Sequence, residues 1–187
     1  MQFEYETKRL IIRVLNETYA SSVLKFYSDG RNEFDAVESP KNAAYYTLDY
    51  QAAALRGEYE AFLHGVYMRY FFFLKEHPDI IVGTASFSNI IRGSYNSCVL
   101  GYKLLPEYQK HGYALEAVSK LVTAVFEEGK LHRIEAYTLS GNINSISLLT
   151  RLGFEFESLA KAVIFLHGGY TDHRRYVLIN PRDVQIK

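Results

Sequence analysis

The sequence predicts one domain of mixed α/β (α+β) class, and three observations carry this prediction. The chain has 187 residues, close to the size of one typical domain. Hydrophobic residues make up 48% and charged residues 22%, values typical of a globular protein with its own core. Strand and helix patterns follow one another without a linker or repeat: one strand, two helices, three strands, then helix, strand, helix and two strands. The domain is therefore expected to span residues 1–187.

The first half of the chain opens with a strand pattern. Leu10, Ile12 and Val14 alternate with two arginines, which indicates a strand. A helix that starts at Asn16 or Thr18 is expected to run to about residue 29, because both residue types cap helices. The other elements of this half are a loop, a helix and three strands, with turns at His77-Pro78-Asp79 and Arg92-Gly93-Ser94: residues 31–42, 43–64, 66–75, 80–90 and 96–105.

Helical spacing returns after Pro106, which ends the last of these strands. Apolar residues recur three and four positions apart from Ala114 to Phe126, and Gly129 is suited to end this helix. The remaining elements are a strand over 134–138, a short helix from Ser145 to Leu152, and two strands over 154–166 and 170–179 joined at Gly168-Gly169. The count is about seven strands and four helices.

Charge and terminal composition exclude several classes of protein. Lys+Arg and Asp+Glu are both 21, so the basic excess expected of a general nucleic-acid binder is absent. The first nine residues are charged where a signal peptide needs an apolar core, and the apolar run Tyr70–Leu74 is too short to span a bilayer. We therefore expect a soluble, cytoplasmic protein that binds neither nucleic acid nor membrane.

Several common catalytic arrangements are missing from the sequence. The six histidines are scattered, and no His or Cys pair has zinc-ligand spacing, so no metal site is expected. The motifs of zinc proteases, serine hydrolases, P-loop proteins and dinucleotide-binding folds do not occur. Cys98, the single cysteine, lies in a strand pattern and is interpreted as a packed thiol.

The stretch from Leu104 to Ala114 is the most informative part of the chain. It predicts a strand, a short loop with Gly112, and the N-terminus of an amphipathic helix. The free backbone N–H groups and the positive end of such a helix favour a phosphate or pyrophosphate. An ordinary strand–helix connection is the alternative that this loop alone leaves open.

Further motifs settle how this loop is interpreted. Gln109-Lys110-His111-Gly112-Tyr113-Ala114 matches the Q/R-x-x-G-x-G/A coenzyme A loop of the GNAT acetyltransferase superfamily, and Gly101-Tyr102-Lys103-Leu104 resembles the strand before it. Other blocks match at the same spacings: Thr7 to Arg13, Gly83 to Phe87, Glu116-Ala117, Leu131 to Ala136, Asn142 to Ser145, Leu152 to Phe154 and Gly169 to His173. Over about residues 7–179 the chain resembles the branch that contains the ribosomal-protein alanine N-acetyltransferases.

The resemblance implies a fold and a cofactor. The GNAT-like fold is a mostly antiparallel mixed sheet that opens in a V between strands expected here at 96–105 and 131–139. Acetyl-CoA would enter the V as co-substrate, with its pyrophosphate on the amides of 109–114. Its pantetheine would pair with Lys103, Leu104 and Leu105, and the N–H of about Leu104 would polarise the thioester carbonyl. Lys110 and His111 either approach the phosphates or are exposed loop residues.

The resemblance also implies catalytic residues. Glu157 lies at the family's G-F-x-x-E position and is the candidate general base, with a solvated strand carboxylate as the alternative. Ser145 would donate to the departing sulfur, unless it is only a first-turn serine of its helix. Asn142 would bond the cofactor's amide or cap that helix. Leu149 stands where many family members carry a Tyr acid, which leaves the general acid open.

The acceptor amine is the least defined part of the prediction. Asn89, Tyr170 and Asp172 are candidate acceptor contacts, since the resemblance brings the ends of their strands near the cleft. The expected function is direct transfer of acetyl to a primary amine, foremost a protein N-terminal α-amine. A small-molecule amine (polyamine, amino acid or antibiotic) and a catalytically silent CoA-binding protein are the alternatives. The oligomeric state is left open, although homodimers are common among the resembling enzymes.

Overall fold

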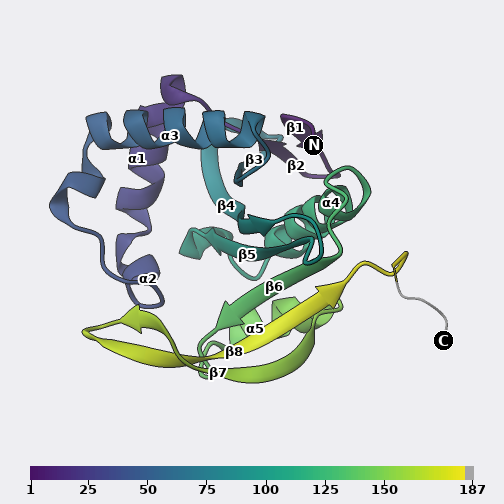
Figure 1. Cartoon of the computed structure of the whole chain (residues 1–187). Coiled ribbons are helices and arrows are strands. Elements are labelled where there is room, and N and C mark those ends of the chain that lie inside the picture. Colours follow the sequence, from purple (N-terminus) through teal and green to yellow (C-terminus); the bar gives the residue numbers. More distant parts are fainter. Residues whose placement is uncertain (184–187) are drawn as a thin grey trace.

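One eight-stranded sheet runs through the computed structural model, which describes residues 1–183 (Figure 1). Its order is β1-β2-β3-β4-β5-β6-β8-β7, and β5 and β6 are the one parallel pair among neighbours. The strands are β1 (Glu4–Glu6), β2 (Leu10–Arg13), β3 (Met68–Leu74), β4 (His77–Ile91), β5 (Ser97–Leu104), β6 (Arg133–Thr138), β7 (Glu155–Leu166) and β8 (Gly169–Ile179).

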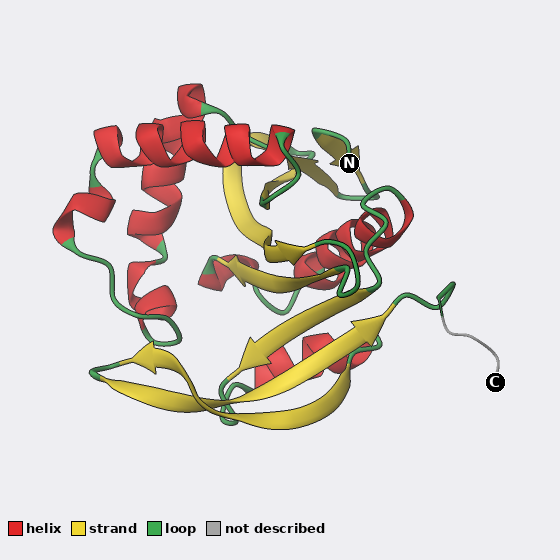
Figure 2. Cartoon of the chain, in the orientation of Figure 1, coloured by secondary structure: helices red, strands yellow, loops and turns green. Residues whose placement is uncertain are grey.

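Helices cover both faces of the sheet (Figure 2). They are α1 (Ala20–Asp29), α2 (Arg31–Asp35), α3 (Leu48–Leu63), α4 (Tyr113–Glu127) and α5 (Ile143–Arg151), with short 3-10 turns at Glu17–Tyr19, Ala43–Tyr46 and Pro106–Tyr108. Side chains of α1 and α3 share one buried cluster with β3 and β4. Side chains of α4 and α5 share a second cluster on the opposite face. The site described below therefore has a distinct helical layer on each side.

β3 lies where both faces of the sheet are buried. Tyr70 and Phe72 belong to the cluster under α4, whereas Phe71 and Phe73 belong to the cluster under α1 and α3. All four side chains are at most 1% exposed. A strand covered on both faces has no need of polar alternation, which explains the continuous aromatic run as core sequence.

The sheet opens between β5 and β6, as predicted. The two strands pair from Ser97–Arg133 to Leu100–Ala136, and no pair follows. Beyond that point β5 continues along β4 as far as Leu104, while β6 continues along β8 as far as Thr138. The last four residues of β5 therefore have a neighbour on one edge and an opening on the other.

Three element predictions were wrong. β1 and α2 were not expected, so residues 1–183 form eight strands and five α-helices where about seven and about four were predicted. Both elements are short, and each buries a single residue, Tyr5 or Phe34, which gives little periodic signal. The predicted turn at 77–79 lies inside β4, because Leu74 pairs with His77 and the turn is Lys75-Glu76. Pro78 is tolerated there since β5 pairs with β4 only from Gly83 onward.

Most predicted boundaries are confirmed to within a few residues. Asn16 accepts a hydrogen bond from the N–H of Thr18 and begins the first helical segment. The predicted helix over 114–126 is α4, whose apolar residues are buried at the expected spacing. Residues 184–187, the end of the predicted domain, lie outside the described part of the chain. Within residues 1–183, no helix combines the length and apolar character needed to cross a membrane.

Candidate active site

The open edge of β5 presents the backbone of Tyr102 and Leu104. Leu105 donates its N–H to the carbonyl of Val82 in β4 at 3.0 Å. Backbone groups of successive strand residues point to opposite neighbours, so Lys103 also faces β4, and Tyr102 and Leu104 face the opening. The carbonyl of Leu104 accepts from Gln109 Nε2 at 3.2 Å, which agrees with this direction.

This alternation corrects two predicted cofactor contacts. The N–H of Leu105 is used by Val82, its carbonyl accepts from Tyr108, and its side chain is buried. The backbone of Lys103 pairs with Thr84 of β4, and its side chain forms an ion pair with Glu38. Leu104 stays a predicted cofactor contact, and Tyr102, whose backbone faces the same opening, is a second candidate.

The loop after β5 ends in an uncapped helix N-terminus. Lys110 (φ 63°) and Gly112 (φ 82°) both take the left-handed backbone conformation. Gly112 is the N-cap of α4 and offers no side-chain hydrogen bond, whereas α3 and α5 begin at capping side chains. The first N–H groups of α4, from Tyr113 and Ala114 onward, have no acceptor within the helix. Left-handed turns and free N–H groups at a helix N-terminus are features that favour an anion.

A charged clamp fixes this loop to the start of the sheet. Glu116, in the first turn of α4, accepts from Thr7 Oγ1 at 2.7 Å and from the backbone N–H and Nε of Arg9 at 2.8 and 2.7 Å. Burial opposes ionisation of Glu116, but these hydrogen bonds outweigh it and lower the pKa of the carboxyl. The Arg9 guanidinium also donates to the carbonyl of His111 and lies 4.4 Å from the centre of the Tyr113 ring. Glu116 therefore positions the loop.

Ser145 and Tyr102 meet across the opening. The Ser145 Oγ lies 2.8 Å from the Tyr102 hydroxyl, and Ser145 is in the first turn of α5. Burial raises the pKa of Tyr102 to about 12, so the phenol stays protonated at neutral pH. Asn142 caps α5 by accepting from the N–H of Ser145 at 3.1 Å. Leu149 is a buried core residue of the same helix.

Glu157 does not carry a free carboxylate. Its oxygens lie 2.8 and 2.9 Å from Arg133 Nη2, and Oε2 lies 2.8 Å from Arg175 Nε. The hydrogen bonds from Arg133 lower its pKa; burial opposes this, and the charges of both arginines add to the lowering. A carboxylate held in this way is a weak proton acceptor.

The three predicted acceptor contacts lie in different places. Asn89 is exposed at a bulge of β4, beside the paired half of β5, so the structure does not bring it to the opening. Tyr170 is 70% exposed at the tip of the β7–β8 hairpin. Asp172 accepts from the N–H of Ala162 at 2.9 Å and pairs with Lys161 at 2.7 Å, so it supports a bulge in β7.

The remaining reactive groups are inert or dispersed. Cys98 is 1% exposed, and burial raises the pKa of its thiol to about 12, which supports the packed interpretation. Across residues 1–183, no three or more His, Cys, Asp or Glu side chains are grouped so that they would hold a metal ion.

Comparison with protein families decides the identity of this site. The model of the GNAT acetyltransferase domain matches residues 9–155, most of the chain. The chain is a GNAT-family acetyltransferase. It is accordingly an acetyl-CoA-dependent acyltransferase. Of the alternatives that the sequence left open, this finding favours an active enzyme over a catalytically silent CoA-binding protein.

Relatives of this acetyltransferase include ribosomal-protein modifying enzymes. It is 32% identical to the probable N-acetyltransferase YjcK of Bacillus subtilis, over 95% of this chain and 98% of that protein. It is 30% identical to the ribosomal protein uS5-alanine N-acetyltransferase of Escherichia coli, over 94% and 90%. The crystal structure of a ribosomal-protein-S5-alanine acetyltransferase from Vibrio fischeri superimposes with a TM-score of 0.91 at 27% identity, over 99% and 100% of the two chains.

Two contacts of the acetyltransferase site were missed by sequence reasoning. The clamp between Arg9 and Glu116 joins residues 107 positions apart, and the hydroxyl pair of Tyr102 and Ser145 joins residues 43 positions apart. All four residues lie in motifs that were recognised, so the motifs were a usable signal. The sequence did not show which of these residues contact one another.

Proposed function

We propose that this acetyltransferase transfers acetyl from acetyl-CoA directly to the α-amine of a protein N-terminus, in a ternary complex. One observation carries the proposal: the sheet opens beyond Leu100–Ala136 immediately beside the uncapped N-terminus of α4. An elongated cofactor with an anionic end fits an open strand edge that leads to an anion site. The similarity to uS5-alanine acetyltransferases supports the choice of acceptor.

Acetyl-CoA is proposed to bind along the open edge of β5. The pyrophosphate accepts hydrogen bonds from the amides of 110–114, and Lys110 and His111 lie at the rim of that loop. The pantetheine amides pair with the backbone of Tyr102 and Leu104. One of these N–H groups polarises the thioester carbonyl, where negative charge develops as the amine attacks.

The proposed chemistry needs little help from an acid or a base. An α-amine with a pKa of about 7.7–8.0 is roughly 10% neutral at pH 7, so water can remove its proton. The departing sulfur receives a proton from the Ser145 hydroxyl, which Tyr102 orients, and the proton that the amine nitrogen loses on acylation restores that hydroxyl. The ion pairs of Glu157 favour a positioning role for this residue over that of the base.

The test measures thiol release from acetyl-CoA with defined amines. The panel contains short peptides that begin with Ala or Ser, the same peptides with blocked N-termini, and small amines. Release with free peptides alone is the expected result, and release with small amines alone assigns the enzyme to small-molecule acetylation. Calorimetry with acetyl-CoA on the same preparation distinguishes a loss of cofactor binding from a loss of acetyl transfer. If acetyl-CoA does not bind, the proposed site is wrong.

A further inference from the structure

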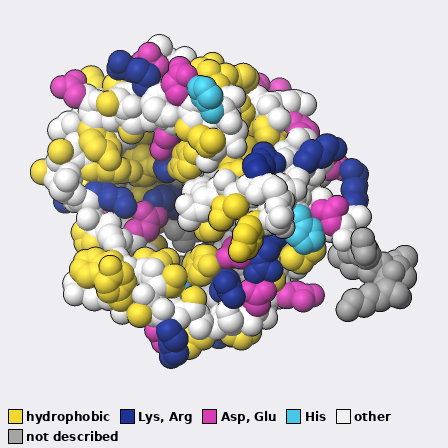
Figure 3. Space-filling view, in the orientation of Figure 1, with side chains coloured by type: hydrophobic (Ala, Val, Ile, Leu, Met, Phe, Trp, Pro, Cys, Tyr) yellow, Lys and Arg dark blue, Asp and Glu magenta, His cyan; other side chains and the backbone are white. Residues whose placement is uncertain are grey.

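A cleft connects the opening of the sheet with the layer of α1 and α3. One hollow of about 200 Å³ lies between α1, α3, β3 and the segment that follows α2, and a second of about 220 Å³ adjoins it. The two share Glu38, Arg69 and Lys103, and the second reaches Gly101 and Tyr102 on the open half of β5. In the space-filling view, the face is hollowed between the α1–α3 layer and the β7–β8 hairpin (Figure 3). The cleft therefore reaches the open half of β5 from the side of α1 and α3.

The charges in the cleft favour anions. Three cationic side chains line it, Lys41, Arg69 and Lys103, against two carboxylates, Glu38 and Glu58. Arg69 forms an ion pair with Glu58 at 3.2 Å. Glu38 forms ion pairs with both Lys103 and, at 3.7 Å, Lys41. Among the described residues that line the cleft, each carboxylate thus already has a cationic partner. A polyamine would meet an excess of positive charge.

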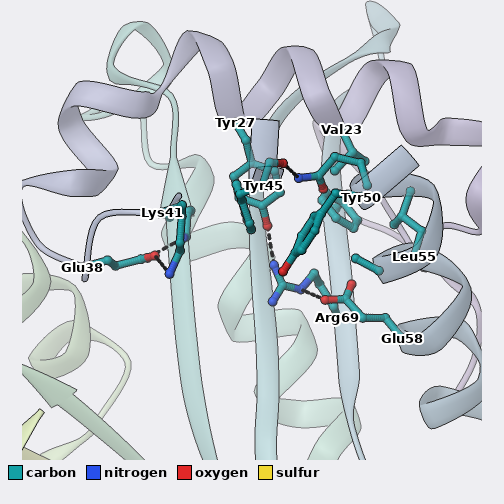
Figure 4. Close-up of a pocket in the computed structure, with 13 residues that line it drawn as sticks. Val23, Tyr27, Glu38, Lys41, Tyr45, Tyr50, Leu55, Glu58 and Arg69 are labelled. Carbon is teal, nitrogen blue, oxygen red and sulfur yellow. Dashed lines mark hydrogen bonds and ion pairs between the residues drawn. The ribbon is translucent and has the colours of Figure 1, made fainter. Parts of the chain in front are cut away.

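The two lysines share a single carboxylate. In Figure 4, Glu38 and Lys41 lie at one end of the cleft and the Arg69–Glu58 pair at the other. Lys103 has a side chain only 17% exposed, and burial lowers its pKa, although Glu38 opposes this. Each ammonium has three hydrogen-bond donors, so one carboxylate leaves donors of both groups unused. A second anion between Lys41 and Lys103 would satisfy them.

We propose that this cleft selects acceptors that carry a carboxylate close to the reacting amine, with Lys103 and Lys41 as its binding residues. The inference rests on the proposed function, because the thioester must lie at the opening. The carboxylate comes either from a free amino acid or from an acidic side chain near a peptide N-terminus. The cationic surroundings also favour the neutral amine over the ammonium form. The amine nitrogen bonds to the acetyl carbon, the carbon–sulfur bond breaks, and the amine's proton ends on the CoA thiol.

The experiment compares acceptors with and without a carboxylate near the reacting amine. Thiol release from acetyl-CoA is measured for peptides that begin Ala-Asp, Ala-Asn and Ala-Lys, for alanine against alaninamide, and for spermidine. We expect the acidic member of at least one pair to have a kcat/KM about tenfold above its neutral twin, and spermidine to be poorest. The pair that shows the preference identifies the source of the carboxylate.

Substitution of the two cleft lysines tests whether they cause the preference for acidic acceptors. In Lys103→Met and in Lys41→Met the ratio between acidic and neutral acceptors is expected to fall toward one. Lys75→Met is the matched control, because Lys75 also pairs with one glutamate, Glu6 at 2.7 Å, but lies outside the cleft. Lys41 is more exposed than Lys103, so its variant provides the test if Lys103→Met fails to fold.

The outcomes separate this inference from the proposed function. Equal rates for charged and neutral twins, or a preference for spermidine, overturn the selection by charge while acetyl transfer itself stands. A preference that persists in both lysine variants overturns the assignment to this cleft. Bound acetyl-CoA with no thiol release from any amine overturns both proposals together.

Discussion

The two sides of the opening between β5 and β6 are built in different ways. The proposed cofactor side uses backbone groups from one continuous stretch, from the end of β5 through the loop to the first turn of α4. The proposed acceptor side uses side chains from α1, the segment after α2, α3, β3 and β5. A site made of backbone groups requires glycines and fixed spacings, which can be recognised in the sequence. A site assembled from the side chains of five separate elements requires no local sequence pattern. We therefore expect substitutions on the cofactor side to weaken the enzyme with every acceptor. Substitutions on the acceptor side are expected to change the preference among acceptors.

The largest expected effect belongs to Gly112 on the cofactor side. Gly112→Trp adds a large side chain at a left-handed residue beside the free amides, where even a Cβ would lie 3.4 Å from Arg9 Nη2. We expect the Kd for acetyl-CoA to rise at least about 100-fold, equivalent to about 2.7 kcal/mol. Calorimetric titration measures this, with circular dichroism as the check on folding.

Gly93→Trp is the control for backbone strain at Gly112. Gly93 also has a positive φ, 76°, and open space around its Cβ position, but lies in the turn between β4 and β5. Its variant is expected to bind acetyl-CoA as the wild type does. If Gly112→Trp binds equally well, the pyrophosphate assignment is wrong.

The sequence predicted more of the proposed cofactor side than of the proposed acceptor side. The reason is the same contrast between a site made of backbone and a site made of side chains. Gly112 and the spacing from Gln109 to Ala114 indicated an anion site because only certain residue types allow that backbone. The alternation that corrected Lys103 and Leu105 depends on the register with β4, which is a tertiary property. The pairing of Glu38 with Lys103 spans 65 positions and crosses a loop without periodicity, so no window of sequence contains it.

The second prediction concerns the clamp that supports the cofactor loop. Glu116→Ala removes an acceptor of three hydrogen bonds from Thr7 and Arg9, and we expect a loss of about 2 kcal/mol in the free energy of unfolding. Glu127→Ala, at the other end of α4, breaks one exposed ion pair with Arg182 and is expected to cost below about 1 kcal/mol. Urea denaturation measures both. Equal losses would show that the clamp adds nothing beyond an ordinary surface pair.

The third prediction tests the hydroxyl pair between β5 and α5. Tyr102→Phe and Ser145→Ala each remove one member of a 2.8 Å hydrogen bond, and each is expected to lower kcat about tenfold with little change in the KM for acetyl-CoA. Because the two groups act together, the double variant should lose little more than either single variant. Tyr95→Phe, at an exposed turn, is the matched control. Fully additive losses would contradict a shared role in proton transfer.

The smallest expected effect belongs to Glu157, outside both sides of the opening. Glu157→Gln removes a charge held by Arg133 and Arg175, so we expect a kcat within about threefold of the wild type and a stability loss below about 1 kcal/mol. Because the pKa of Glu157 is lowered in the folded state, its contribution is present above the ordinary carboxyl pKa of 4.5 and is lost as the pH falls below it.

Thermal unfolding from pH 7 to pH 3 follows this contribution from Glu157. The melting temperatures of wild type and Glu157→Gln are expected to differ at pH 7 and to converge in acid. Glu155→Gln serves as control on the same strand, because its exposed carboxylate forms no ion pair within residues 1–183. A kcat that drops more than about tenfold, together with loss of the acidic limb of the pH–rate profile, would instead make Glu157 the base. The acceptor side would then extend across β6 to β7, and proton removal from the amine would depend on Glu157, despite its two arginines, rather than on water.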